Sequence, residues 1–305
     1  MTVRLRDLLL GLRDLHLNQA PVIVHSSLKS FGSVEGEAET VVTALGTVFT
    51  TVMVPTFTYK TMVTPLIGPE NNAITYGSGE DLNQMVEFFR PGMPADPLMG
   101  VIAENLRRHP KATRSSHPIQ SFAGFNAEKF LSTQVISDHL APLRLLEEQD
   151  GWFVLLGVDH TVNTSIHYAE KIAGRRQFVR WALTQTGVVE CPGFPGCSAG
   201  FQAIAPDMEK FTRRVQIGNA TVQAAPLKML FRVVVARLKK DPLALLCQQE
   251  DCERAIEWNG HLEPELDQSH RHDDAGQAQG HQRHIVEEAP AGHPGAQVNP
   301  ADQCA

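Results

Sequence analysis

Residues 151–173, GWFVLLGVDHTVNTSIHYAEKIA, decide the fold of this chain. Residues 152–158 form a continuous apolar run of seven after Gly151, and polar residues follow immediately. A run of that length and character is typical of a central strand that is covered on both faces. Residues 164–173 then have helical character, and Asn163 is a good N-cap for that helix. A buried strand that leads through a short polar loop into a helix predicts an α/β fold.

The sequence before this stretch repeats the same alternation of short apolar runs and helical patterns. Two further buried strands are predicted at residues 22–24 and 51–54. Between the second and third strands we expect a loop-rich excursion and then two helices, at residues 59–97, about 98–108 and about 126–132. The fold class is therefore α/β, with a mixed, largely parallel sheet flanked by helices in a single catalytic domain, residues 1–258.

The C-terminal end of the chain has a different composition. Residues 259–305 are rich in Gln, His, Gly, Pro and Asp and show almost no aliphatic periodicity. Such a segment cannot bury enough apolar area to offset the entropy of ordering it, so we predict a disordered, dispensable tail. Nine acidic and two basic residues fall within residues 255–305, which therefore account for the whole net charge of −7 and leave residues 1–254 neutral.

A neutral body produces no field that would favour nucleic acid. No run approaches the ~18 apolar residues of a membrane-spanning helix. Residues 1–17 form an amphipathic helical pattern and no small-residue cleavage site follows, which does not match a signal peptide. We expect a cytoplasmic protein that binds neither nucleic acid nor membrane, and the sequence leaves homodimerisation open.

The five cysteines stand at positions 191, 197, 247, 252 and 304. In a chain without a secretion signal, reduced thiols are the default, so we predict no metal. A zinc site made from Cys191-x5-Cys197 and Cys247-x4-Cys252 is the open alternative. Against it, the first gap is wider than zinc sites usually have, and no pair of histidines accompanies the cysteines.

One stretch resembles a hydrolase signature without its context. GCSAG at residues 196–200 matches the G-x-S-x-G nucleophile elbow, but Pro192 and Pro195 precede it where a strand is required. The only later histidines lie in the predicted tail. We interpret GCSAG as a turn. Neither a phosphate-binding G-x-x-x-x-G-K-[ST] loop nor a dinucleotide-binding G-x-G-x-x-G occurs.

Polar residues follow each of the three predicted strands. In open α/β sheets, ligands bind beyond the carboxyl ends of the strands, so these residues are candidates for one site. In the helix after the third strand, His167 and Glu170 are three positions apart and share a face. A carboxylate beside an imidazole orients the ring and stabilises its protonated form, which is the arrangement that a general base needs.

Four segments resemble the aminoglycoside 3-N-acetyltransferase family, in order and spacing, from about residue 5 to about residue 255: HSSLKSFG (25–32), VPTFTY (54–59), RSSHPIQSFAGFN (114–126) and LLGVDHTVNTSIHYAE (155–170). The resemblance implies an α/β enzyme that transfers acetyl from acetyl-CoA to an amine, with His167 as general base and Glu170 as its support. It implies cofactor-binding residues Ser26, Ser27, Leu28, Phe31, Thr56, Phe57, Ser116 and His117. For the substrate amine the candidates are His25, Tyr59, Asp159, His160 and Asn163.

The sequence says less about the identity of the acceptor amine than about the acetyl-transfer reaction. The excursion at about residues 62–93 looks longer than in aminoglycoside-modifying members, and a neutral body does not by itself attract a polycation. A local acidic cleft would need some of Glu70, Glu80, Asp81, Asp96 and Asp159. The alternative is a CoA-binding protein of the same fold without aminoglycoside activity, which acts on another amine or on none.

Overall fold

The computed structural model describes residues 2–17, 19–248 and 252. The predicted tail at residues 259–305 lies outside them. The strands are β1 (Thr2–Val3), β2 (Val22–Ser26), β3 (Ser33–Val34), β4 (Val52–Pro55), β5 (Met62–Val63), β6 (Ala112–Arg114), β7 (Phe122–Phe125), β8 (Trp152–Leu156), β9 (Phe178–Thr184), β10 (Gly187–Phe194), β11 (Arg213–Ile217) and β12 (Ala220–Pro226). The α-helices are α1 (Leu5–Asp14), α2 (Glu37–Val48), α3 (Glu80–Asn83), α4 (Gly100–Arg108), α5 (Glu128–Leu131), α6 (Ala141–Glu148), α7 (Ser165–Ile172), α8 (Ala205–Met208) and α9 (Leu227–Lys240).

The main sheet has seven strands in the order β11-β12-β8-β2-β4-β7-β6. Its centre is parallel, because β2 pairs in parallel with both β8 and β4. The outer strands pair antiparallel: β12 with β8, β11 with β12, β7 with β4 and β6 with β7. The prediction of a mixed α/β sheet flanked by helices is confirmed, and its parallel part is the three strands that were visible in the sequence.

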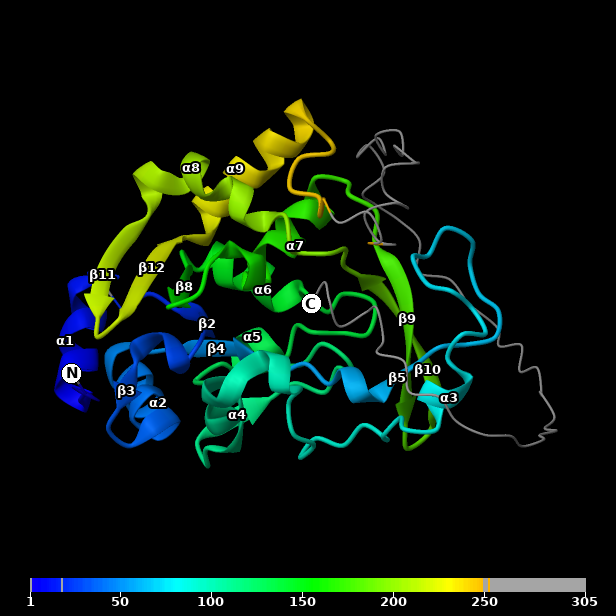
Figure 1. The fold of residues 1–305 in the computed structure, drawn as a ribbon, viewed down its shortest axis with the longest axis horizontal. Helices are drawn as coiled ribbons and strands as arrows, with labels where there is room; N and C mark the ends of the chain where they lie inside the picture. The colour runs from blue at the N-terminus through cyan, green and yellow to red at the C-terminus, as the bar shows by residue number, and fades with distance from the viewer. Residues whose placement is uncertain (1, 18, 249–251, 253–305) are drawn as a thin grey trace.

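Helices cover both faces of this sheet (Figure 1). Alternate residues of β8 show why its sequence is apolar throughout. Val154 and Leu156 pack into one core cluster with residues of α1, α2 and α4, whereas Phe153 and Leu155 pack into a second cluster with residues of α5 to α9. A strand with helices on both faces has no solvated side, so the usual alternation of polar and apolar residues is lost.

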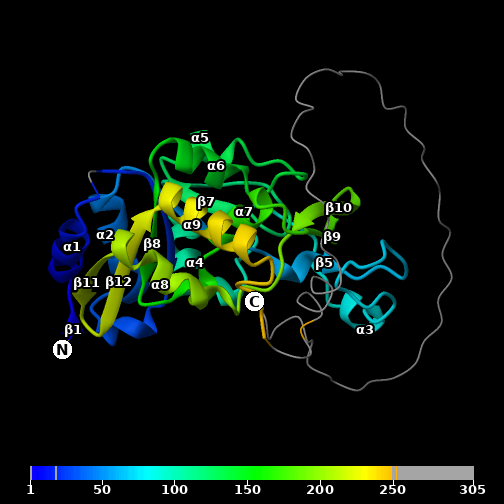
Figure 2. The same ribbon diagram turned by 90° about the horizontal axis from the view of Figure 1, so that it is seen from above.

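A second sheet of three strands, in the order β10-β9-β5, lies beyond one end of the main sheet, as both views show (Figures 1 and 2). Every second residue of β9 is buried over its first five positions, which is the pattern of a strand with one solvated face. Its buried side chains form a small core with those of β10. The sequence analysis did not predict this sheet.

Several predicted boundaries are shifted by one or two residues. β2 continues to Ser26, and β8 ends at Leu156, two residues earlier than predicted. β8 ends there because Gly157 has a φ of 66°, and a Cβ at this position would lie 1.8 Å from the Ser30 hydroxyl oxygen. Only glycine combines that backbone conformation with so close an approach, and it brings the loop after β2 against the end of β8.

No helix within residues 2–17 and 19–248 is both long enough and apolar enough to cross a membrane.

Candidate active site

His25 is the next-to-last residue of β2, and it connects that strand to the start of α7. Its Nε2 accepts a hydrogen bond of 3.1 Å from the backbone N–H of Thr164, so the proton of the neutral ring is on Nδ1. Burial, together with the charges that His160 and His167 would bear, lowers the pKa of His25 to about 3. His25 is therefore a neutral, fixed side chain between the ends of β2 and β8.

His167 and Glu170, both on α7, form the predicted pair. The His167 Nδ1 and a Glu170 carboxylate oxygen are 2.8 Å apart, and the two residues are 9% and 2% exposed. The ring of Phe201 packs edge-on against the imidazole at 4.7 Å between centroids. With the Nδ1 proton donated to Glu170, the Nε2 lone pair is the basic atom, and within the described residues it makes no hydrogen bond.

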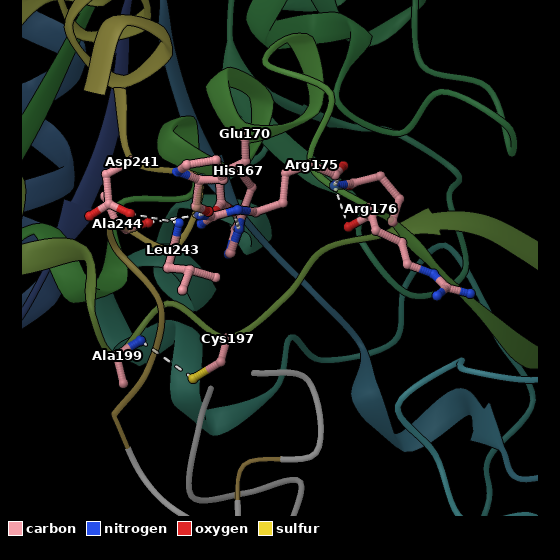
Figure 3. Close-up of polar contacts among 11 residues, drawn as sticks. His167, Glu170, Arg175, Arg176, Cys197, Ala199, Asp241, Leu243 and Ala244 are labelled. Carbon is pink, nitrogen blue, oxygen red and sulfur yellow. Dashed lines mark hydrogen bonds and ion pairs between the residues drawn. The ribbon is translucent and has the colours of Figure 1, made fainter. Parts of the chain in front are cut away.

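Arg175 completes this arrangement, and the sequence analysis missed it. Its guanidinium forms a short ion pair with the second carboxylate oxygen of Glu170. The same guanidinium donates to the carbonyl oxygens of Pro242 and Ala244, each at 2.7 Å (Figure 3). Glu170 is thus held between His167 and Arg175, and the chain after α9 is attached to Arg175. The glycine at position 174 was a sequence signal for the end of the helix. Its φ of 86° ends α7 and turns the chain back toward Glu170.

Replacing Arg175 with methionine is expected to lower the free energy of unfolding by about 3–5 kcal/mol, because a buried carboxylate would lose its charged partner. Urea unfolding measures this change. Arg176→Met is the matched control, since among the described residues the Arg176 guanidinium donates a single hydrogen bond of 3.4 Å, to the Glu70 carbonyl at the surface. A loss no larger in Arg175→Met than in the control would contradict the structural role of the ion pair.

The loop between β8 and α7 is fixed by its own polar side chains. The Asp159 carboxylate accepts hydrogen bonds from the backbone N–H and the hydroxyl of Thr161. Asn163 Oδ1 accepts from the N–H of Ser165 at 3.2 Å, and its Nδ2 lies 3.3 Å from Nδ1 of His160. α7 therefore begins at Ser165, one residue later than predicted, and Asn163 still satisfies an N–H of its first turn.

His160 and Asp159 differ in their surroundings. His160 is 2% exposed and packs edge-on against Phe153, and burial lowers its pKa to about 4. Its backbone N–H donates to the Gln202 side chain at 2.9 Å, which attaches the loop to the segment after β10. Asp159 lies in an open pocket of about 500 Å³ with Ser30 and residues of β12, and neither His167 nor Glu170 lines that pocket.

At the end of β4, the segment VPTFTY is bonded to the segment RSSHPIQSFAGFN. The Thr56 hydroxyl donates to the Ser121 carbonyl at 3.1 Å, and the hydroxyls of Thr58 and Thr61 both donate to the Pro118 carbonyl. Thr56 is fully buried, and Phe57, 4% exposed, makes edge-on ring contacts with Tyr59 and Phe122. The two segments form one unit beside β2, a contact that the sequence analysis did not predict.

His117 is held inside this unit and contacts a histidine that the sequence analysis missed. Its Nδ1 accepts from the N–H groups of Ile119 and Gln120, at 3.2 and 3.0 Å. Burial lowers its pKa to about 4, and the carbonyl of Ile136 partly opposes that shift. The ring of His139 lies 5.6 Å from that of His117, and burial, with His117, Lys171 and His167 nearby, lowers the pKa of His139 well below its ordinary value. No pattern in the sequence marked His139.

The remaining predicted cofactor residues separate into two groups. Ser26, Ser27 and Leu28 are partly buried at the edge of the sheet, and Ser116 is exposed. The N–H of Ser27 donates to the Leu156 carbonyl at 3.0 Å, which joins the loop to β8. Phe31 is a correction: it is fully buried in the core cluster of α1, α2 and α4, so it has no surface with which to contact a cofactor.

Two curated proteins are similar to parts of this chain. The chain is 38% identical over 89 residues to aminoglycoside N(3)-acetyltransferase IV of Salmonella sp., which covers 26% of this chain and 32% of that protein. It is 30% identical over 168 residues to the prophage-derived aminoglycoside N(3')-acetyltransferase-like protein YokD of Bacillus subtilis (strain 168), which covers 49% and 57%. The matched stretches thus span less than two thirds of either curated relative.

Solved structures share the fold over most of the chain. The apoenzyme of aminoglycoside acetyltransferase AAC(3)-IVa superposes with a TM-score of 0.69 and 23% identity, covering 85% of this chain and 98% of that one. AAC-IIIb in a binary complex with CoASH superposes with a TM-score of 0.63 and 20% identity, covering 79% and 97%. At these identities the structures establish the fold.

The family model for aminoglycoside 3-N-acetyltransferase matches residues 23–239, which span β2 to α9 and include every residue of the His167–Glu170–Arg175 arrangement. The chain belongs to the aminoglycoside 3-N-acetyltransferase family.

Proposed function

We propose that this protein transfers acetyl from acetyl-CoA to an amine of an aminoglycoside or a similar small molecule, with His167 as general base. The observation on which the proposal rests is the chain of contacts from His167 through Glu170 to Arg175. It fixes the imidazole by its Nδ1 and leaves Nε2 as the basic atom. Supporting this are the family membership and the relatives that are named for the same activity.

The chemistry requires such a base. An aliphatic amine is largely protonated at neutral pH, so it must lose a proton before it attacks the thioester carbonyl. In the proposed reaction the ammonium group first loses that proton to solvent. His167 Nε2 then takes the second proton from the amine nitrogen as this nitrogen forms a bond to the acetyl carbon, and the C–S bond breaks to release the CoA thiolate. The imidazolium then returns its proton to the leaving sulfur. Glu170 supports the positive charge that His167 bears between the two proton transfers.

We propose that acetyl-CoA binds along the ends of β2 and β4, where Ser26, Ser27 and Leu28 are partly exposed and Ser116 is exposed. The three serines offer hydroxyls, and the loop offers backbone N–H groups, to phosphate and amide oxygens. The relative AAC-IIIb was solved with CoASH on the same fold. Thr56 and His117 are better placed to hold this surface than to touch the cofactor, because their polar atoms bond to the chain itself.

For the acceptor amine we propose the surface around the start of α7, which the buried His25, His160 and Asn163 hold in place from below, with the partly exposed Tyr59 from the unit at the end of β4. Asp159, whose carboxylate is bonded to Thr161, positions the loop. Because His25 and His160 have lowered pKa values and are neutral at pH 7, they do not repel a polycationic amine.

The test is release of free CoA thiol from acetyl-CoA, measured across a panel of aminoglycosides and simpler aliphatic amines. Turnover with an aminoglycoside supports the whole proposal. Turnover restricted to other amines supports the mechanism and refutes the substrate. Measurable acetyl-CoA binding with no thiol release for any amine would refute the proposed activity and favour a CoA-binding protein of the same fold.

A further inference from the structure

Two segments that are far apart in the sequence bring three cysteines into one buried group, here named the thiol cluster: Cys197, Cys247 and Cys252. Their sulfur atoms all lie within 4.8 Å of one another, and the residues are only 5–6% exposed. No disulfide joins them. The three side chains form an apolar cluster of their own, separate from the two main cores of the described chain. Cys191 is not a member, because it packs in the small core of β9 and β10. The sequence analysis left open a zinc set of four cysteines, and its inclusion of Cys191 is wrong.

The thiol cluster has the chemistry of a thiolate metal site. Cys247 and Cys252 are separated by four residues, which is within the usual spacing of paired zinc ligands. The backbone N–H of Ala199 points at the Cys197 sulfur at 3.5 Å (Figure 3). An N–H donor stabilises a thiolate more than a neutral thiol, and such bonds to the ligand atom are a regular feature around metals.

We propose that the thiol cluster is a structural zinc site. Thiolates at about 2.3 Å from a tetrahedral zinc ion lie roughly 3.8 Å from one another, a small contraction of the observed group. Three thiols lose their protons on binding, and the cation neutralises charges that burial would otherwise disfavour. The fourth ligand is water or another donor. No oxidation or reduction is involved, since zinc has no redox chemistry in this setting.

The position of the cluster gives it a structural role beside the active site, and Figure 3 draws one of its members, Cys197, together with His167 and Glu170. Cys197 begins the segment that ends in Phe201, whose ring packs on His167. A Cβ at Gly200 would lie 2.2 Å from the Leu246 carbonyl oxygen, so this segment is in direct contact with the chain before Cys247. That same stretch supplies the carbonyls of Pro242 and Ala244 to Arg175. A metal in the cluster would thus fasten together the two segments that support His167 and Glu170.

The experiment is metal analysis of the full-length chain, purified under reducing conditions with any affinity tag removed. We expect about one zinc ion per chain, and cobalt exchange should produce thiolate-to-cobalt charge-transfer absorption. Cys197→Ser and Cys247→Ser should each weaken zinc binding at least about tenfold, measured by competition with a chromophoric chelator. Cys191→Ser, which removes a buried thiol outside the cluster, should leave the zinc content unchanged.

Two results would overturn the site. One is a chain without zinc that also fails to take it up when zinc is added to the reduced protein. The other is zinc that persists when all three cluster cysteines are replaced by serine, which would place it elsewhere. If a variant fails to fold, the zinc content and cobalt spectrum of the unmodified chain still decide. The support that the site gives to catalysis rests on the proposed function, but neither metal readout does. Zinc without acetyl transfer would refute only that function, and acetyl transfer without zinc only the site.

Discussion

His167→Ala is expected to lower kcat for acetyl transfer by about 10²- to 10⁴-fold, because the amine would lose the group that removes its proton. The imidazole is fixed to Glu170 at 2.8 Å and contacted by Phe201, so the loss should concern chemistry more than binding. Thiol release at saturating acetyl-CoA measures kcat, and equilibrium binding of acetyl-CoA to the variant should change little. The comparison separates a lost base from a lost binding site.

His167→Asn is the matched variant for this measurement. An asparagine amide can donate to Glu170 as Nδ1 does, yet it has no basic nitrogen. It should therefore keep the thermal stability of the parent and be as inactive as the alanine variant. Turnover within a few-fold of the parent in either variant would show that another group accepts the proton, and His167 would lose the role proposed for it.

Mild acid is expected to destabilise the folded protein between about pH 6.5 and pH 4. Four buried histidines have lowered pKa values, about 3 for His25, about 4 for His117 and His160, and well below 6.5 for His139. Above pH 6.5 each is neutral in both states and stability is complete. As the pH falls below 6.5, the unfolded chain takes up protons that the folded chain does not, so unfolding becomes favoured.

Each of these histidines contributes up to about 1.4 kcal/mol per pH unit within that window, so the four together contribute up to about 5 kcal/mol per unit. Urea unfolding at pH 7.5, 6.5 and 5.5 would measure the slope. His139→Gln should reduce the slope by up to about one proton equivalent, whatever its effect on stability at pH 7.5. A free energy of unfolding that is constant from pH 6.5 to 5.5 would contradict the burial of neutral histidines. Glu104, Glu128 and Glu209 do not interfere, since their pKa values are lowered from 4.5.

The features visible in the sequence are those that local physics controls. The apolar run at residues 152–158 predicted a doubly covered strand, because every residue of such a strand must be buried. The His167–Glu170 pair was readable because three positions on a helix always place two side chains on one face. The convergence of the segments after β2, β4 and β8 followed from the rule that parallel strands bring their carboxyl ends to one edge. Family membership was carried by the same segments.

Other features depend on contacts between distant parts of the chain, which no local pattern encodes. The antiparallel outer strands and the sheet of β5, β9 and β10 depend on which strands pair, and short alternating strands do not specify their partners. The burial of Phe31 was decided by α1 and α2 packing over it.

What the sequence by itself determined is the α/β frame, the edge of the sheet where the candidate site lies and the His167–Glu170 pair. The tertiary structure alone decided the partners of that pair. Arg175 meets Glu170 because the chain turns back at Gly174, and Pro242 and Ala244 hold Arg175 because α9 ends beside it. Cys197 meets Cys247 and Cys252 for the same reason, although some fifty residues separate them. Charges and thiols can be buried only with partners, and partners so distant in the chain are brought together by packing alone.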